Sequence, residues 1–156
     1  YWNNPTGWQE LTLWYNSQGL DVYHSSKEGD APKGSIQLGE SLEEVAACIN
    51  SAEHFIGISS GLSWFAWALD KHVILISGFT DPYVEFQTNV SYINNHQVCH
   101  GCWGNRVFDR GDWNWCPDWK DTQRHFECTK TISADMVISQ AASLLKTTAD
   151  HKKEKV

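Results

Sequence analysis

Four of the five cysteines in this 156-residue chain fall within one short stretch, at positions 99, 102, 116 and 128. Their spacing is C-x2-C-x13-C-x11-C, which is typical of a site where four thiolates surround one metal ion. Thiolates suit zinc and iron alike, and four of them leave no open coordination position. The pattern therefore predicts a structural metal site formed by Cys99, Cys102, Cys116 and Cys128; disulfides or a redox-active CxxC pair are the alternatives.

The stretch from residue 96 to residue 129 has few aliphatic residues with which to build a core of its own. A metal ion would supply the ordering energy that burial does not. We interpret the histidines in this stretch as groups at the surface or beside the metal, because four thiolates already complete the shell; they are His96, His100 and His125. Aromatic residues are expected to cover the metal site or to contact a neighbouring subunit: Trp103, Phe108, Trp113, Trp115, Trp119 and Phe126.

A second candidate site lies in the sequence GISSGLSW at residues 57–64, where an apolar run leads into a predicted helix. The N–H groups in the first turn of a helix have no internal partners and carry a partial positive charge. We therefore predict that Ser59, Ser60, Gly61 and Leu62 hold an anionic group such as a diphosphate, mainly through main-chain amides. In the alternative interpretation, Ser60 only caps the helix and Gly61 only saves space. Neither a GxGxxG motif nor a P-loop is present.

Three further residues lie close to this turn. Trp67 is predicted to be part of the core, whereas Trp64, in the first helical turn, is placed to flank a sugar or a base. Asp81 precedes a proline, so it either starts a turn or contacts a ligand hydroxyl.

The elements that position these residues follow from two brief apolar runs, HFIGI at 54–58 and HVILIS at 72–77, with the helix-like LSWFAWAL between them. A strand, a helix and a strand at this spacing indicate a βαβ unit, and strands that are apolar on both faces belong to a parallel sheet covered by helices. The predicted fold class is therefore α/β. The first helix is predicted to begin near Asn4, or at Thr6 with Gln9 completing a capping box, and to end at Gly19. A second helix begins with a Ser41–Glu44 capping box and buries Cys48. The remaining predicted elements are short strands at 20–25 and 36–38, an edge strand at 90–93, and a last helix from Ser133 to about Lys146.

Composition disfavours several classes of protein. The chain is 41% hydrophobic and 20% charged, as is typical of a folded globular protein. Its formal net charge of −7 disfavours a nucleic-acid binder, which must neutralise phosphates. No stretch is long and apolar enough to span a bilayer, and the start does not resemble a signal peptide, so we expect a cytoplasmic protein. Because the sequence begins with Tyr1, we expect it to be part of a longer protein.

The run SLEEVAACINSAEHFIGISSGLSWFAWALDKHVILISGFTDP at residues 41–82 resembles the C-terminal domain of family 9 heptosyltransferases. With the CHGC cluster that follows, the chain is most similar to bacterial autotransporter heptosyltransferases, which transfer heptose from ADP-heptose to serines of an adhesin. The resemblance implies a Rossmann-like sheet with flanking helices, forming the C-terminal half of a GT-B fold. We therefore divide the chain into a nucleotide-sugar-binding domain at 1–95 and 130–147, a four-cysteine metal-knuckle insertion at 96–129, and a frayed tail at 148–156.

The resemblance also places the donor-binding loop of the family on Ser59, Ser60, Gly61 and Leu62, although the family's Asp is Ser59 here and its His is Trp64. It implies iron, with zinc as the second choice, in the cysteine site, and a homo-oligomeric ring. The family's catalytic base is an Asp on an N-terminal domain that nothing in this sequence matches, so we expect the isolated chain to bind the donor without catalysing transfer. The alternatives are a non-enzymatic metal-knuckle module that binds proteins, or a GT-B transferase that uses a UDP-sugar.

Overall fold

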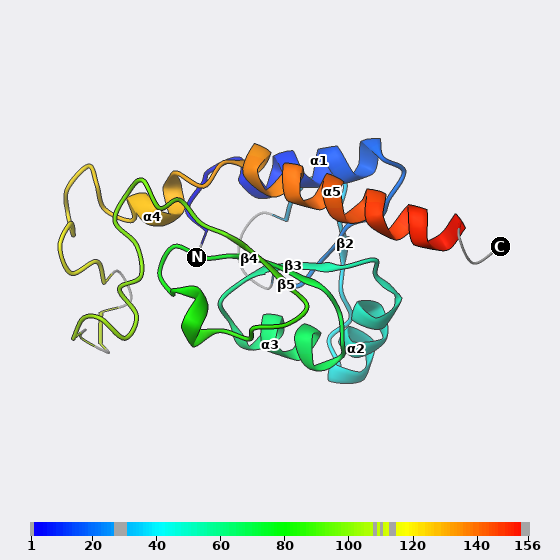
Figure 1. Ribbon diagram of the computed structural model, residues 1–156, viewed down its shortest axis with the longest axis horizontal. Helices are drawn as coiled ribbons and strands as arrows, with labels where there is room; N and C mark the ends of the chain where they lie inside the picture. Colours follow the sequence, from blue (N-terminus) through cyan, green and yellow to red (C-terminus); the bar gives the residue numbers. More distant parts are fainter. Residues whose placement is uncertain (1, 27–30, 108, 110, 113–114, 154–156) are drawn as a thin grey trace.

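The computed structural model describes residues 2–26, 31–107, 109, 111–112 and 115–153, with the backbone alone for 148–153. Its centre is a parallel sheet in the order β3 (Phe55–Ile58), β4 (Val73–Ile76) and β5 (Val90–Ile93). A second parallel pair joins β1 (Tyr23–His24) to β2 (Ile36–Gln37). Helices lie above and below the strands (Figure 1). The predicted α/β class, with parallel strands flanked by helices, is confirmed.

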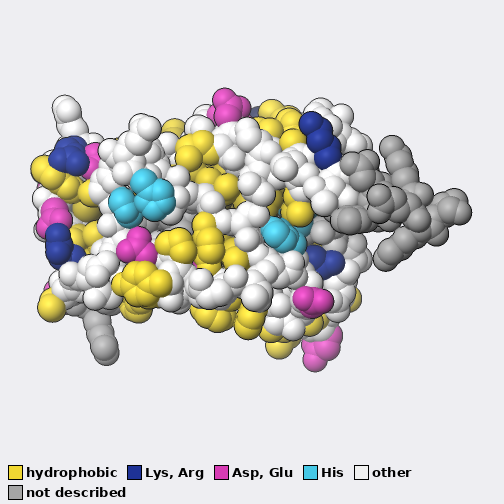
Figure 2. All heavy atoms as spheres, in the orientation of Figure 1, with side chains coloured by type: hydrophobic (Ala, Val, Ile, Leu, Met, Phe, Trp, Pro, Cys, Tyr) yellow, Lys and Arg dark blue, Asp and Glu magenta, His cyan; other side chains and the backbone are white. Residues whose placement is uncertain are grey.

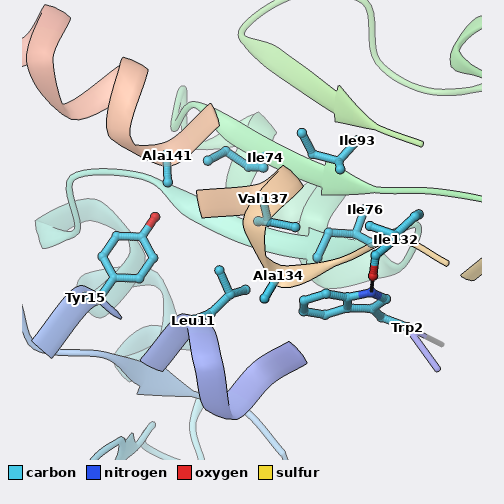
Figure 3. Packing of buried hydrophobic residues seen from close by; sticks show 10 residues of the cluster. All are labelled: Trp2, Leu11, Tyr15, Ile74, Ile76, Ile93, Ile132, Ala134, Val137 and Ala141. Atoms are coloured by element: carbon cyan, nitrogen blue, oxygen red, sulfur yellow. Dashed lines mark hydrogen bonds between the residues drawn. The ribbon is translucent and has the colours of Figure 1, made fainter. Parts of the chain in front are cut away.

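The middle strand, β4, is buried along its whole length because both of its faces are covered. Its side chains alternate between the two faces, as they do in any strand. Ile74 and Ile76 pack in one hydrophobic cluster, shown in Figure 3, and Val73 and Leu75 pack in the other. The apolar run at 72–77 was therefore correctly interpreted as a strand in a covered parallel sheet.

The cluster in Figure 3 joins the sheet to α1 (Gly7–Ser17) and α5 (Ala134–Lys153). Trp2 ties the two ends of the chain together, because its indole N–H donates to the Ile132 carbonyl oxygen at 2.9 Å.

Two predictions about these helices are wrong. The Thr6 side chain makes no capping hydrogen bond, because its hydroxyl donates to Asn4 Oδ1 at 3.3 Å and the Gln9 amide bonds to the Lys33 backbone. The helix α5 continues to Lys153, past the expected end at Lys146 and into the expected frayed tail at 148–156, because no Gly or Pro interrupts it.

On the opposite face lie α2 (Leu42–Ser51) and α3 (Gly61–Ala68). The predicted capping box of α2 is confirmed, since Ser41 Oγ accepts from the Glu44 N–H and the Glu44 carboxylate accepts from the Ser41 N–H. Cys48 on this helix is only partly buried. The helix α3 approaches β3 closely at Gly57, where a Cβ atom would lie 2.4 Å from Ser63 Oγ.

After β4 the chain forms a short 3-10 helix, η1 (Pro82–Val84), and the cysteine-rich stretch later ends in α4 (Glu127–Lys130). This stretch extends beyond one end of the sheet (Figure 1). It is held to the loop after β4 by two backbone hydrogen bonds, from Gly101 N–H to the Gly78 carbonyl and from Trp103 N–H to the Phe79 carbonyl, each of 3.0 Å. None of the helices formed by the described residues is both long and apolar enough to cross a membrane.

Candidate functional site

The turn between β3 and α3 is open to solvent. Ser59, Ser60 and Gly61 are all exposed. Ser60 has an extended backbone, and its carbonyl accepts from the N–H groups of Ser63, at 3.1 Å, and Trp64, at 3.3 Å. The N–H groups of Gly61 and Leu62 donate to no acceptor in the described part of the chain. The turn therefore presents two free amides at the positive end of a helix.

The geometry argues against the alternative in which this turn is purely structural. The Ser60 side chain makes no capping hydrogen bond to α3. A Cβ atom at Gly61 would meet nothing within 4 Å, so close packing does not require glycine there. The serine hydroxyl and the space beside the glycine are both available to a ligand.

A hollow of about 830 Å³ lies next to this turn. Its walls come from the segments that follow β1 and β2, from the start of α2, and from Leu62 of α3. The carboxyl ends of parallel strands meet at one edge of a sheet, and ligands bind at that edge. Apart from Leu62, the residues that line the hollow were not predicted from the sequence, because they come from segments that are far apart in the chain. They are Ser25, Ser26, Gln37, Leu38, Gly39, Glu40, Leu42 and Val45.

The two tryptophans of α3 differ in their surroundings. Trp67 is half-buried, and its ring stacks on Phe86 with 5.5 Å between centroids. Trp64 remains 40% exposed, although its edge contacts with Trp67 and Phe86 restrict its orientation. Figure 2 shows hydrophobic side chains gathered over η1 and α3, where Tyr83 is also exposed. Trp64 thus offers a flat apolar surface one helical turn from the free amides.

Asp81 connects the sheet to the cysteine-rich stretch. Its carbonyl accepts from the Val84 N–H, which starts η1 as the sequence indicated. Its carboxylate lies beside Gly101, where a Cβ atom would come within 2.3 Å of Oδ2, and accepts a long hydrogen bond of 3.5 Å from the Asn105 amide. The contacts of this carboxylate are therefore within the protein.

The four clustered cysteines are free thiols that lie in one neighbourhood. Burial raises the pKa of Cys99 to about 12 and that of Cys128 to about 11, and it also raises the pKa of Cys102. The thiols raise one another's pKa as well: Cys99 is affected by Cys102 and Cys128, and Cys116 affects both Cys102 and Cys128. Such mutual repulsion between thiolates is the electrostatic setting that a bound cation would relieve.

The donor set thus fits a thiophilic metal in its chemistry. However, no three Cys, His, Asp or Glu side chains in the described residues are grouped closely enough to ligate an ion. The predicted four-thiolate site is therefore not formed as a coordination shell. His96 and His100 contact each other at 3.2 Å on the surface. Trp113 and Phe108 lie outside the described residues.

Comparison with known families decides the class of the chain. The model of glycosyltransferase family 9 (heptosyltransferase) matches residues 5–103, which include both the open turn and the loop after β4. The chain belongs to this family. The resemblance drawn from residues 41–82 is confirmed.

This member of family 9 is similar to several autotransporter heptosyltransferases. BAHTCr of Citrobacter rodentium (strain ICC168) is 40% identical over 150 residues, covering 88% of this chain and 36% of that protein. TibC of Escherichia coli O78:H11 (strain H10407 / ETEC) is 39% identical, over 88% of this chain and 37% of its own length. BimC of Burkholderia thailandensis (strain ATCC 700388 / DSM 13276 / CCUG 48851 / CIP 106301 / E264), named as inactive, is 34% identical over 87% of this chain and 35% of its own. The chain spans little more than a third of these relatives.

The structural match is equally close. A crystal structure of TibC, described as a dodecameric iron-containing heptosyltransferase in complex with ADP-D-beta-D-heptose, superimposes on this chain with a TM-score of 0.84. The sequence identity is 37%, and the match covers 94% of this chain and 42% of that chain. The fold described above is therefore the one that TibC uses over the same region.

Proposed function

We propose that this chain is the donor-binding part of a heptosyltransferase that takes heptose from ADP-heptose. The observation that supports this most directly is the pair of free amides at Gly61 and Leu62, beside a large hollow at the carboxyl ends of β1 and β2. An α/β protein of this family with such a hollow has the features needed to hold a nucleotide sugar. In this proposal the region corresponds to the C-terminal half of a GT-B fold.

The proposed pose follows from the chemistry of each wall. The diphosphate lies at the start of α3, where the amides of Gly61 and Leu62 and the hydroxyls of Ser59 and Ser60 donate to its oxygens. The nucleoside occupies the hollow, where the Glu40 carboxylate can accept from ribose hydroxyls. This placement leaves the sugar on the Trp64 side of the turn.

The acceptor in this proposal is a serine hydroxyl of an autotransporter adhesin; the names of the relatives support an autotransporter as the target. Transfer to a hydroxyl needs a base to remove its proton and a site that stabilises the departing diphosphate. In this proposal the chain supplies the second requirement. We therefore expect it to bind the donor and, without the remainder of the protein, not to catalyse transfer.

The thiols of Cys99, Cys102, Cys116 and Cys128 would hold a metal ion, with iron as the first choice because TibC is described as iron-containing, and zinc as the second. A four-thiolate metal would supply cross-linking and ordering energy to a stretch that has little aliphatic core. By analogy with the dodecameric TibC, we expect the whole protein to be a homo-oligomer. We also expect it to work in the cytoplasm.

The experiment that tests this function is a calorimetric titration of the 156-residue chain with ADP-heptose, ADP and UDP. Preference for the adenine nucleotides supports the proposal. Preference for UDP would instead indicate a transferase that uses UDP-sugars. No binding of any nucleotide, in a chain that retains its metal and fold, would favour a non-enzymatic module that binds proteins through the cysteine-rich stretch.

A further inference from the structure

Glu85 is a buried carboxylate directly after η1, and the mechanism proposed above does not use it. Only 6% of the residue is exposed, and both carboxylate oxygens are shielded from solvent with no hydrogen-bond partner among the described residues. It takes part in none of the ion pairs that the described side chains form. Burying a carboxylate without a partner is costly, so this arrangement calls for a partner from outside the described chain.

The position of Glu85 connects it to the open turn. Its N–H donates to the Pro82 carbonyl at 3.2 Å, which closes η1 at the same sheet edge. The next residue, Phe86, lies with its ring 5.1 Å from that of Trp64, in the first turn of α3. Tyr92 donates to the Phe86 carbonyl, and its pKa is raised by burial and then by the charge of Glu85. Glu85 therefore adjoins in the chain the residue that packs against Trp64 of α3, and its carboxylate lies within electrostatic reach of Tyr92 on β5.

The chemistry of the expected ligand limits what this partner can be. Phosphate oxygens repel a carboxylate, so Glu85 does not bind the diphosphate, which belongs at the amides of α3. The group attached next to the diphosphate is a neutral sugar whose hydroxyls are hydrogen-bond donors. A carboxylate has acceptor capacity for two such hydroxyls.

We propose that Glu85 is a specificity-determining residue that accepts hydrogen bonds from hydroxyls of the transferred sugar. This inference rests on the proposed function, because it requires a nucleotide sugar at α3. Because both oxygens are shielded from solvent, the proposal requires η1 to move when the sugar binds, and the sugar then pairs an acceptor that has no partner among the described residues. ADP lacks the sugar and so gains nothing from Glu85. Sites built in this way discriminate strongly against ligands that lack the hydroxyl group.

The test compares the affinities of ADP-heptose and ADP in three proteins: the unaltered chain, Glu85→Gln, and the control Glu10→Gln, which changes an exposed carboxylate on α1. We expect Glu85→Gln to reduce the preference for ADP-heptose over ADP by about ten-fold or more, because charge-assisted hydrogen bonds are lost. Its affinity for ADP and the preference shown by Glu10→Gln should both stay unchanged. Thermal melting of Glu85→Gln should occur at or above the temperature of the unaltered chain, since the amide removes an unpaired buried charge.

An unchanged preference in Glu85→Gln would overturn the inference. An equal loss of affinity for ADP-heptose and for ADP would also overturn it, because Glu85 would then support the fold or the diphosphate site rather than the sugar. If Glu85→Gln fails to fold, Glu85→Asp provides the same comparison with the charge retained and the reach shortened. Failure of the unaltered chain to bind ADP is a different result, which rejects the proposed function itself.

Discussion

Replacing Gly61 with aspartate gives a direct test of the donor site, because it adds a negative charge where the diphosphate is expected. No atom of the described residues lies within 4 Å of a Cβ placed at Gly61, so the Cβ of the new side chain fits without a clash. Its backbone angles are not in the left-handed region that requires glycine. An acidic residue in the first turn also stabilises a helix by about 0.3–1 kcal/mol. The substitution should therefore preserve or raise the stability of the chain.

The effect on binding follows from Coulomb's law. Two unit charges about 6 Å apart repel by about 0.7 kcal/mol at the dielectric constant of water and by about 3 kcal/mol at an effective value of about 20. These energies correspond to an increase of about three- to a hundred-fold in the Kd for ADP. Because the turn is exposed, added salt should reduce the effect.

The assay is calorimetric titration with ADP, together with thermal melting of each variant. Gly61→Asn is the matched control, since it adds nearly the same volume without the charge and should retain most of the affinity. Weaker ADP binding by Gly61→Asp than by Gly61→Asn, with no loss of melting temperature, is the expected outcome. If both variants bind ADP as well as the unaltered chain does, the diphosphate does not lie at α3 and the proposed pose is incorrect.

Three further predictions concern the support of the site. Burial, followed by the charge of His72, lowers the pKa of His54 to about 4, whereas the unfolded residue titrates near 6.5. The free energy of unfolding should therefore be highest above pH 6.5 and fall by about 3 kcal/mol as the pH drops towards 4. Urea unfolding at several pH values measures this change. Gly57→Ala should destabilise the chain by about 1–3 kcal/mol through the contact with Ser63, and adding Ser63→Ala should recover part of the lost melting temperature. If the cysteines hold a metal, Cys116→Ser should lose metal, measured by elemental analysis, and melt at a lower temperature, whereas Cys48→Ser should keep its metal.

The sequence was most informative where one local pattern determines the structure. The run HVILIS is apolar throughout, and it forms a strand that is covered on both faces. Ser41 and Glu44 lie three residues apart, and together they form the capping box of α2. Thr6 and Gln9 show the same type of pattern, but Gln9 instead finds the Lys33 backbone, which is far away in the sequence. A local motif fails when a tertiary partner competes for the same side chain.

The candidate site was only partly predictable for a similar reason. The open turn was found because four consecutive residues, from Ser59 to Leu62, carry its chemistry. The hollow beside it draws its walls from four separate segments, and no spacing within the sequence brings Ser25, Gly39 and Leu62 together. Glu85 was missed because its burial without a partner among the described residues can be seen only once the chain is folded.

The open turn and the loop that holds the cysteine-rich stretch follow two neighbouring strands, β3 and β4, which links the two candidate sites physically. The turn follows β3, and the loop that anchors the cysteines follows β4, its hydrogen-bonded neighbour. At Gly78 in that loop, a Cβ atom would lie 2.2 Å from the Cys128 carbonyl oxygen, so the last cysteine packs directly on the chain leaving β4. Ordering the thiols around a metal would therefore stiffen the segment that leads into η1 and Glu85, whereas the amides of α3 depend on β3 and Gly57. Loss of metal should accordingly weaken sugar recognition more than diphosphate binding.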